Sequence, residues 1–154
     1  MGRKTRLAGT VGAAAIALVG AWEGLRLTAY RDVVGIPTVC YGETYGVKMG
    51  DKHTKAECDQ MLLASLKKHE RGMRKCLRDP NAIPAKSYVA FVSLTYNIGV
   101  VGFCRSTAAR RLNRGDVKGA CDAATWFKKA GGRTIRGLVN RRAAEHRLCL
   151  EGLK

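Results

Sequence analysis

Aromatic residues and proline are scarce in this chain of 154 residues, at 6% of the sequence and three positions respectively. Sandwiches and barrels of strands are rich in aromatic and β-branched side chains, so this scarcity, beside abundant alanine and leucine, favours helices. The few prolines and a hydrophobic fraction of 46% exclude a disordered chain. Internal repeats and Gly/Ser/Pro linkers are missing as well, so we expect one folded domain.

Acidic residues are also few: the chain has 12 Asp and Glu and 28 Lys and Arg, which gives a formal net charge of +16. Such a surplus attracts polyanions: nucleic acid, anionic lipid or the bacterial envelope. A nucleic-acid-binding module is disfavoured, since no such motif is present and few aromatics are available for stacking on bases. We expect an anionic envelope surface as partner and no nucleic acid. A membrane-active cationic protein and a merely solvated basic surface remain alternatives, and the densest basic runs are 110–115 and 141–147.

Closely spaced metal ligands are missing too. None of the six cysteines, at positions 40, 58, 76, 104, 121 and 149, forms a C-x-x-C pair, and the three histidines are scattered. Zinc ligands usually come in close pairs, so we predict no metal site and no cofactor. An even, widely spaced set of cysteines favours three disulfides and an oxidising compartment such as the bacterial periplasm. Six buried thiols in a cytosolic protein are the alternative.

The uncharged stretch at residues 7–22 is rich in alanine and glycine and follows the basic residues Arg3, Lys4 and Arg6. A positive start before an apolar run is typical of an export signal. As a helix, residues 7–21 would span about 22 Å, less than a hydrocarbon core of about 30 Å. We therefore predict a weak, releasable membrane anchor over residues 1–22. A buried, alanine-rich first helix is the alternative, and the same residues can play both parts in turn.

Residues that can carry chemistry follow this stretch. Helical periodicity stops near Gly24, and turn signals predict an antiparallel hairpin or three-stranded sheet over residues 30–47. Glu23 then lies at the carboxyl end of a helix beside apolar Trp22, where desolvation and the helix dipole favour a protonated carboxylic acid. Asp32 lies in a polar turn and is expected to stay ionised. Two carboxylates in such different environments are typical of a glycosidase acid and base.

Thr54 and Glu57 have the spacing of a capping box and open a predicted helix that runs to about Leu77. Cys58 and Cys76 lie on one face of this helix, about 27 Å apart, so they cannot pair with each other. After a turn at 79–81, further helices are predicted at 84–97, 106–113, 116–128 and 138–150.

The spacing Glu23-x8-Asp32-x5-Thr38, within EGLRLTAYRD and GIPTVCYGET, resembles the catalytic signature of phage lysozymes in glycoside hydrolase family 24. Segments that resemble the family's later helices and turns follow in the same order, at 91–99, 102–113, 126–132 and 137–142. The resemblance covers residues 18–150. It implies a mostly helical α+β fold of the lysozyme type, in which a small N-terminal β-sheet lobe is joined by a long helix to a helical C-terminal lobe.

The activity implied by the resemblance is that of a phage endolysin, a muramidase that cuts peptidoglycan between N-acetylmuramic acid and N-acetylglucosamine. Glu23 would protonate the glycosidic oxygen. Asp32 and Thr38 would hold and activate a water on the opposite face, giving inversion with the carboxyl groups about 6.5–9.5 Å apart. Arg141 matches a family arginine that pairs with the catalytic glutamate, which would oppose the effect of burial on Glu23.

Substrate contacts carry over from the family to Tyr30, Thr44, Tyr96, Asn97 and Ser106. Tyr96 fits a core aromatic equally well, and Ser106 fits a helix cap. One position departs from the family pattern, because Glu43 stands where the family often has a histidine that makes a structural salt bridge. That departure puts the bridge in doubt but not the catalysis.

By the same resemblance, residues 1–22 match the signal-anchor-release segment of some phage endolysins, and 23–154 form a single catalytic domain. The chain would be tethered transiently in the host inner membrane, then reach the periplasm and act on peptidoglycan as a monomer. The implied disulfides are a hypothesis, since six cysteines allow 15 pairings. The proposed pairs are Cys40–Cys58, Cys76–Cys104 and Cys121–Cys149.

Overall fold

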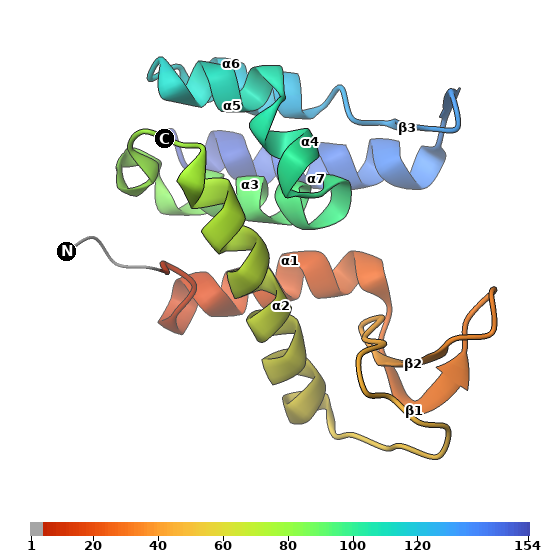
Figure 1. The fold of residues 1–154 in the computed structure, drawn as a ribbon. Helices are drawn as coiled ribbons and strands as arrows, with labels where there is room; N and C mark the ends of the chain where they lie inside the picture. Colours follow the sequence, from red (N-terminus) through yellow and green to blue (C-terminus); the bar gives the residue numbers. More distant parts are fainter. Residues whose placement is uncertain (1–4) are drawn as a thin grey trace.

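The computed structural model describes residues 5–154, so the predicted basic residues Arg3 and Lys4 lie outside the described part. The chain forms two lobes joined by a long helix, as predicted (Figure 1). The first lobe holds the hairpin β1 (Arg26–Arg31) and β2 (Pro37–Cys40), and α2 (Lys55–Lys75) leads to the second. The remaining elements are η1 (Pro80–Ala82), α3 (Ala85–Ile98), α4 (Val100–Cys104), α5 (Thr107–Asn113), α6 (Val117–Ala124), β3 (Lys129–Ala130), β4 (Arg133–Thr134) and α7 (Arg136–Glu151).

The helix α1 (Gly9–Glu23) contains the predicted apolar segment and packs on α2 and α3. Its small residues allow close packing: a Cβ on Gly20 would lie 3.1 Å from the ring of Tyr41. The helix ends at Glu23 because Gly24 adopts a φ of 71°, which favours glycine. Among residues 5–154, no helix is long and apolar enough to cross a membrane.

The residues just before α1 are fastened to the junction of α2 and α3. Leu7 is fully buried, and the buried carboxylate of Glu70 accepts hydrogen bonds from the Thr5 hydroxyl, the Arg6 backbone amide and the Tyr88 hydroxyl. Buried carboxylates are retained only where such donors surround them. Residues 5–7 are therefore part of the folded helical lobe.

The hairpin pairs Tyr30 with Thr38 and Arg31 with Pro37 in an antiparallel ladder. Isolated antiparallel bridges join Thr28 of β1 to Lys52, and Val39 of β2 to Glu43. The predicted start of the sheet at residue 30 was four positions late, because β1 begins at residue 26. Only Ala29 of this strand is buried, so the early part of the strand carries no alternation of apolar and polar residues.

The helix α2 begins where the capping box predicted: the Thr54 hydroxyl accepts from the Glu57 amide, and the Glu57 carboxylate accepts from the Thr54 amide. It leads to α3, whose residues 87–95 are all buried and form the centre of the helical lobe. The short elements α4, β3 and β4 were not predicted, and α6 ends four residues earlier than expected. The two β3–β4 strands are fully exposed, so no hydrophobic pattern marks them.

Three disulfides hold these elements together, and their pairing is the one that the resemblance implied. Cys40–Cys58 ties the hairpin to α2, Cys76–Cys104 ties the end of α2 to the end of α4, and Cys121–Cys149 ties α6 to α7. No cysteine among the described residues is left free. The first two bridges therefore link both lobes to the connecting helix, and the third lies within the helical lobe.

Candidate active site

Glu23 is the last residue of α1, and its carboxylate is held by the last helix of the chain. Arg141 Nη1 on α7 donates to Glu23 Oε1 over 2.7 Å. The Arg141 side chain is almost completely buried, whereas that of Glu23 is 25% exposed. An accessible carboxyl group with one oxygen fixed by arginine is positioned to exchange a proton through the other oxygen.

Arg141 belongs to a buried cluster of charged side chains on α7. Its Nε lies 3.6 Å from Glu145 Oε2, and Arg142 Nε lies 2.6 Å from Glu145 Oε1. The Ser93 hydroxyl donates to Glu145, and Arg142 Nη2 donates to the same oxygen over 3.0 Å. Burial raises the pKa of Glu145, while both arginines and Ser93 lower it. The cluster fixes the guanidinium that orients Glu23.

Trp22, which precedes Glu23 in α1, lies at the surface of the helical lobe. Trp22 is partly exposed and lines a groove between α1 and α7 with Ala144 and Leu148. Successive residues of an α-helix point about 100° apart, so the neighbour of Glu23 faces a different side. Glu23 itself is hydrogen-bonded to Arg141, and its charge acts on Tyr96.

Asp32 and Thr38 are brought together by the hairpin. Asp32 Oδ1 accepts from the backbone amides of Val34 and Ile36, each over 2.9 Å, which closes the turn after β1. The Thr38 hydroxyl donates to the Ile36 carbonyl over 2.9 Å. Asp32 and Thr38 thus share one backbone partner residue. Among the described residues, Asp32 Oδ2 has no hydrogen-bond partner and remains available as an acceptor.

Tyr96 on α3 connects Glu23 with the hairpin lobe. Burial, together with the negative charges of Glu23 and Glu43, raises the pKa of Tyr96 to about 12 against the opposing charge of Arg141. Its ring meets that of His69 edge to face, with centroids 5.0 Å apart. Tyr96 is only partly buried, so it can pack in the core and still leave part of its side chain accessible to a substrate.

Glu43, in the place of the family histidine, accepts a hydrogen bond from the Ser65 hydroxyl over 3.3 Å. Burial raises the pKa of Glu43, whereas Ser65 and the nearby His69 lower it. His69 Nδ1 lies 2.8 Å from the Ser65 carbonyl, so this nitrogen carries the hydrogen. Glu43 and His69 thus form a polar contact region between α2 and the hairpin lobe that the sequence did not reveal, because a lone histidine on a helix face carries no spacing signal.

The other predicted substrate residues differ in accessibility. Thr44 and Asn97 are exposed, and the Tyr30 ring is covered by Arg26, whose Cζ lies 4.3 Å from its centroid. Ser106 is buried: its hydroxyl donates to the Phe103 carbonyl over 2.6 Å and accepts from the Ala109 amide. Ser106 is therefore the N-cap of α5, as in the alternative interpretation.

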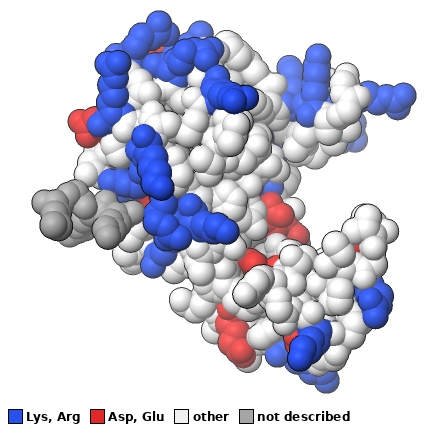
Figure 2. All heavy atoms as spheres, viewed as in Figure 1, with Lys and Arg blue, Asp and Glu red and all other residues white. Residues whose placement is uncertain are grey.

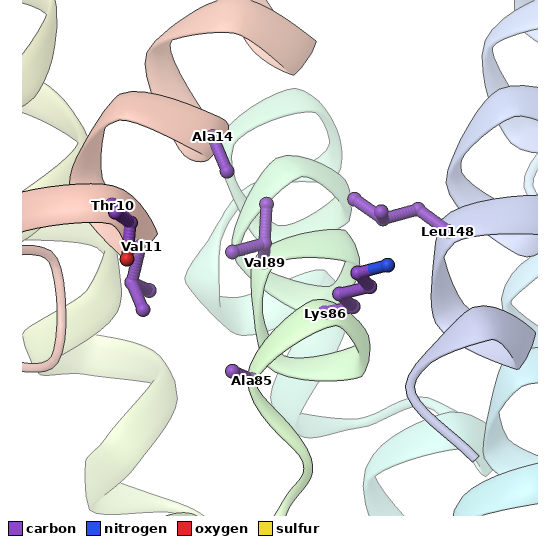
Figure 3. A pocket seen from close by; sticks show the side chains of 7 residues that line it. All are labelled: Thr10, Val11, Ala14, Ala85, Lys86, Val89 and Leu148. Carbon is purple, nitrogen blue, oxygen red and sulfur yellow. The ribbon is translucent and has the colours of Figure 1, made fainter. Parts of the chain in front are cut away.

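The surface has an indentation between the lobes and a separate apolar pocket within the helical lobe. Figure 2 shows an indentation between the helical and hairpin lobes in which acidic side chains gather, whereas basic side chains form groups on the outer parts of this face. An apolar pocket between α1, α3 and α7 contains Lys86 as its single charged lining residue (Figure 3). That pocket contains none of the predicted site residues. Among residues 5–154, no cluster of His, Cys, Asp or Glu is arranged to hold a metal ion.

Comparison with known proteins agrees with this geometry. The family model described as phage lysozyme matches residues 20–145. The chain is 40% identical to a SAR-endolysin of Pseudomonas phage phiKMV, over 94% of this chain and 91% of that protein. It is 39% identical to a SAR-endolysin of Enterobacteria phage P21, over 84% of this chain and 78% of that protein.

Solved structures show the same fold. An endolysin from Escherichia coli O157:H7 phage FAHEc1 superposes with a TM-score of 0.79 and 32% identity, over 97% of this chain and 94% of that one. A mutant of P22 lysozyme superposes with a TM-score of 0.82 and 34% identity, over 90% of this chain and 96% of that one. The predicted two-lobed helical architecture is confirmed.

Proposed function

The chain belongs to the phage lysozyme family, and from this premise we propose that it is an endolysin: a muramidase that hydrolyses the β-1,4 bond between N-acetylmuramic acid and N-acetylglucosamine. The observation that carries the proposal is the pairing of Glu23 with Arg141, with Asp32 and Thr38 together on the adjoining hairpin. The product is cleaved peptidoglycan and the outcome is lysis of the host cell.

Glu23 is the general acid. Among the described residues, its Oε2 has no hydrogen-bond partner, so this oxygen can hold the proton that passes to the glycosidic oxygen. Loss of the proton leaves a carboxylate beside Arg141, whose charge stabilises it.

Asp32 and Thr38 activate the water. Because Asp32 Oδ1 is engaged by two backbone amides, Oδ2 is the oxygen that accepts the water proton. The Thr38 hydroxyl donates its hydrogen to the Ile36 carbonyl, so its lone pairs face incoming donors such as water. Attack from the face opposite the leaving group gives inversion. Tyr30, Thr44, Tyr96 and Asn97 are proposed to contact the sugar chain.

The decisive experiment measures reducing ends released from purified Gram-negative peptidoglycan by the wild type and by Glu23→Gln. The amide keeps an oxygen for Arg141 but has no acidic proton, so release should fall by about 10²–10⁴-fold. Unchanged circular dichroism of the variant excludes misfolding as the cause. Equal release by the two proteins would overturn the assignment of Glu23, and no release by either would overturn the muramidase.

Residues 1–22 are proposed to act first as a signal-anchor-release segment in the inner membrane, before residues 23–154 work as a monomeric catalytic domain in the periplasm. The relatives named SAR-endolysins support this proposal. So does the composition of α1, which is apolar on all sides although Ala13, Ala17 and Trp22 face solvent. A helix without a polar face is unusual on a protein surface.

A more apolar segment should be harder to release. In Ala13→Leu/Ala17→Leu, both substitutions lie at exposed positions of the folded protein, so the domain should tolerate them. Membrane pelleting before and after depolarisation of expressing cells should show release of the wild type and retention of the variant. Absence of the wild type from the pellet before depolarisation, or equal release of both proteins, would contradict the anchor.

After release, the surplus of basic residues is proposed to keep the enzyme near the anionic envelope. Basic side chains form several groups on the face of the helical lobe that Figure 2 shows, whereas acidic ones gather in the indentation. Such attraction is long-ranged at low salt and screened as salt increases.

A further inference from the structure

Three arginines surround a hollow of about 310 Å³ on the helical lobe, and it shares no lining residue with the active site. Arg78 comes from the turn after α2, Arg110 from the last turn of α5, and Arg114 from the residue that caps α5. Asn113 completes the lining. Positions 78 and 114 are far apart in the sequence, so the fold brings the three charges together.

The positive charge of this hollow is not neutralised by the protein. Within residues 5–154, none of the three arginines makes an ion pair with a carboxylate, and neither Asp79 nor Asp116, the nearest acids in the sequence, contacts them. The intervening Arg111 differs, because its guanidinium stacks on the ring of Trp126 and donates to the Gly119 carbonyl. Arg111 supports the fold, whereas its neighbours line the hollow.

The backbone that carries Arg78 is fixed at two points. Asn113 Oδ1 accepts from the Arg78 amide over 2.8 Å, and Asn113 Nδ2 donates to the Cys76 carbonyl over 2.9 Å. The Cys76–Cys104 disulfide then fastens the same turn to the end of α4. The spacing between the end of α2 and the end of α5 is therefore set by the folded framework.

The side chain of Arg110 is held in one direction by two hydrogen bonds. Its Nη1 donates to the Arg105 carbonyl over 2.9 Å and its Nη2 to the Thr107 hydroxyl over 2.7 Å. Each of these nitrogens carries a second hydrogen, which remains for a ligand. A guanidinium held in one direction loses little freedom when it binds an anion.

Cations at the carboxyl ends of α2 and α5 also offset the helix dipoles. That role needs a single cation at each end and does not require a shared hollow. We propose that the hollow binds a dianionic phosphate group, either inorganic phosphate or the phosphate monoester of an envelope-lipid headgroup. Arginine forks match the oxygens of phosphate in paired hydrogen bonds, and three positive charges exceed the charge of the dianion. This binding goes beyond the proposed hydrolysis and does not depend on Glu23.

Titration calorimetry with sodium phosphate, against sodium chloride at equal ionic strength, tests the site directly. Phosphate should bind the wild type, and Arg114→Gln should weaken binding roughly tenfold, the effect of one lost charge-assisted hydrogen bond. Arg114 is the safest single change, because its side chain makes no hydrogen bond or ion pair within the described residues. A triple Arg78→Gln/Arg110→Gln/Arg114→Gln variant should abolish binding.

The matched control removes the same charge elsewhere, through Lys48→Gln, Lys52→Gln and Lys68→Gln, all at exposed positions. This control should bind phosphate as the wild type does. An equal loss of phosphate binding in the control and in the arginine triple variant would show that net charge alone causes the effect, and would overturn the site. Binding heats that do not differ between phosphate and chloride would overturn it as well. If the triple variant fails to fold, Arg114→Gln decides.

Co-sedimentation with vesicles separates the two sources of phosphate. Phosphatidylcholine vesicles that contain phosphatidic acid present a monoester, whereas those that contain phosphatidylglycerol present a diester. Stronger sedimentation with phosphatidic acid, lost in the arginine triple variant but kept in the lysine control, identifies a lipid headgroup. Binding of inorganic phosphate with equal sedimentation of all variants identifies the free ion. Failure in both arms overturns the proposal.

Discussion

Arg141 and Glu23 stand 118 positions apart in the chain, yet the guanidinium and the carboxylate are only 2.7 Å apart. The contact joins the last residue of the first helix to the last helix. Because Arg141 also contacts Glu145, the proposed acid is positioned by the helical lobe, whereas Asp32 stands on the hairpin. The proposed acid and base thus belong to different lobes, which the helix α2 joins.

Replacing Arg141 by lysine should keep the charge but lose the fork that reaches both Glu23 and Glu145. We expect kcat for reducing-end release to fall at least about tenfold, with KM little changed. Arg141→Met should in addition destabilise the fold by about 3 kcal/mol, because breaking a buried ion pair leaves charge uncompensated. Denaturant unfolding measures the second effect. Wild-type kcat in both variants would contradict the positioning role.

Asp32 has a structural and a proposed chemical function, and two substitutions separate them. Asp32→Asn keeps an oxygen that can accept from the amides of Val34 and Ile36, so the turn should persist. It removes the proton acceptor, and activity should fall by about 10²-fold or more. Asp32→Ala should lose both the turn and the activity. Normal activity in Asp32→Asn would contradict the assignment of the base, whereas equal instability of the two variants would contradict the account of the turn.

Ser106→Ala tests the helix cap. Removal of an N-cap hydroxyl should cost about 1 kcal/mol, seen as a lower midpoint in urea, with KM for peptidoglycan unchanged. Thr44→Ala is the matched comparison, since Thr44 is exposed and proposed to contact the sugar chain. It should raise KM and leave the midpoint unchanged. A raised KM in Ser106→Ala would restore the substrate interpretation.

Local features of the fold were predictable because their causes lie within a few residues. The capping box at Thr54 and Glu57 marks the start of α2, and the Asp32–Thr38 spacing describes one hairpin. Gly24 ends α1 for a reason visible in the sequence, since glycine tolerates a positive φ. These signals placed Glu23, Asp32 and Thr38 at the carboxyl end of a helix and in the adjoining hairpin before any tertiary contact was known.

The supporting contacts around Glu23 were not predictable, because they arise from helix packing. Ser93 and Glu145 meet only when α3 and α7 pack together, and each alone resembles an ordinary polar residue of a helix. Only the family resemblance selected Arg141 from the many arginines of this basic chain.

Glu43 and Glu57 should respond to pH with opposite signs. Burial raises the pKa of Glu43 above 4.5, so the folded state holds this proton more tightly than the unfolded state. The stability that this group contributes is present below pH 4.5 and is lost as pH rises through the raised pKa. Glu43→Gln keeps an acceptor for Ser65 and removes that loss. Its thermal midpoint, relative to the wild type, should therefore increase from pH 4 to pH 7.

Glu57→Gln supplies the opposite case. The backbone amide of Thr54, followed by His53, lowers the pKa of Glu57, so the charged form stabilises the fold above pH 4.5 and the effect disappears on acidification. Its midpoint should lie below that of the wild type at pH 7 and approach it as pH falls through the lowered pKa. Thermal scans of the three proteins between pH 3 and pH 7 decide the matter. Parallel curves for Glu43→Gln and the wild type would show that this carboxyl group titrates alike in the folded and unfolded chains.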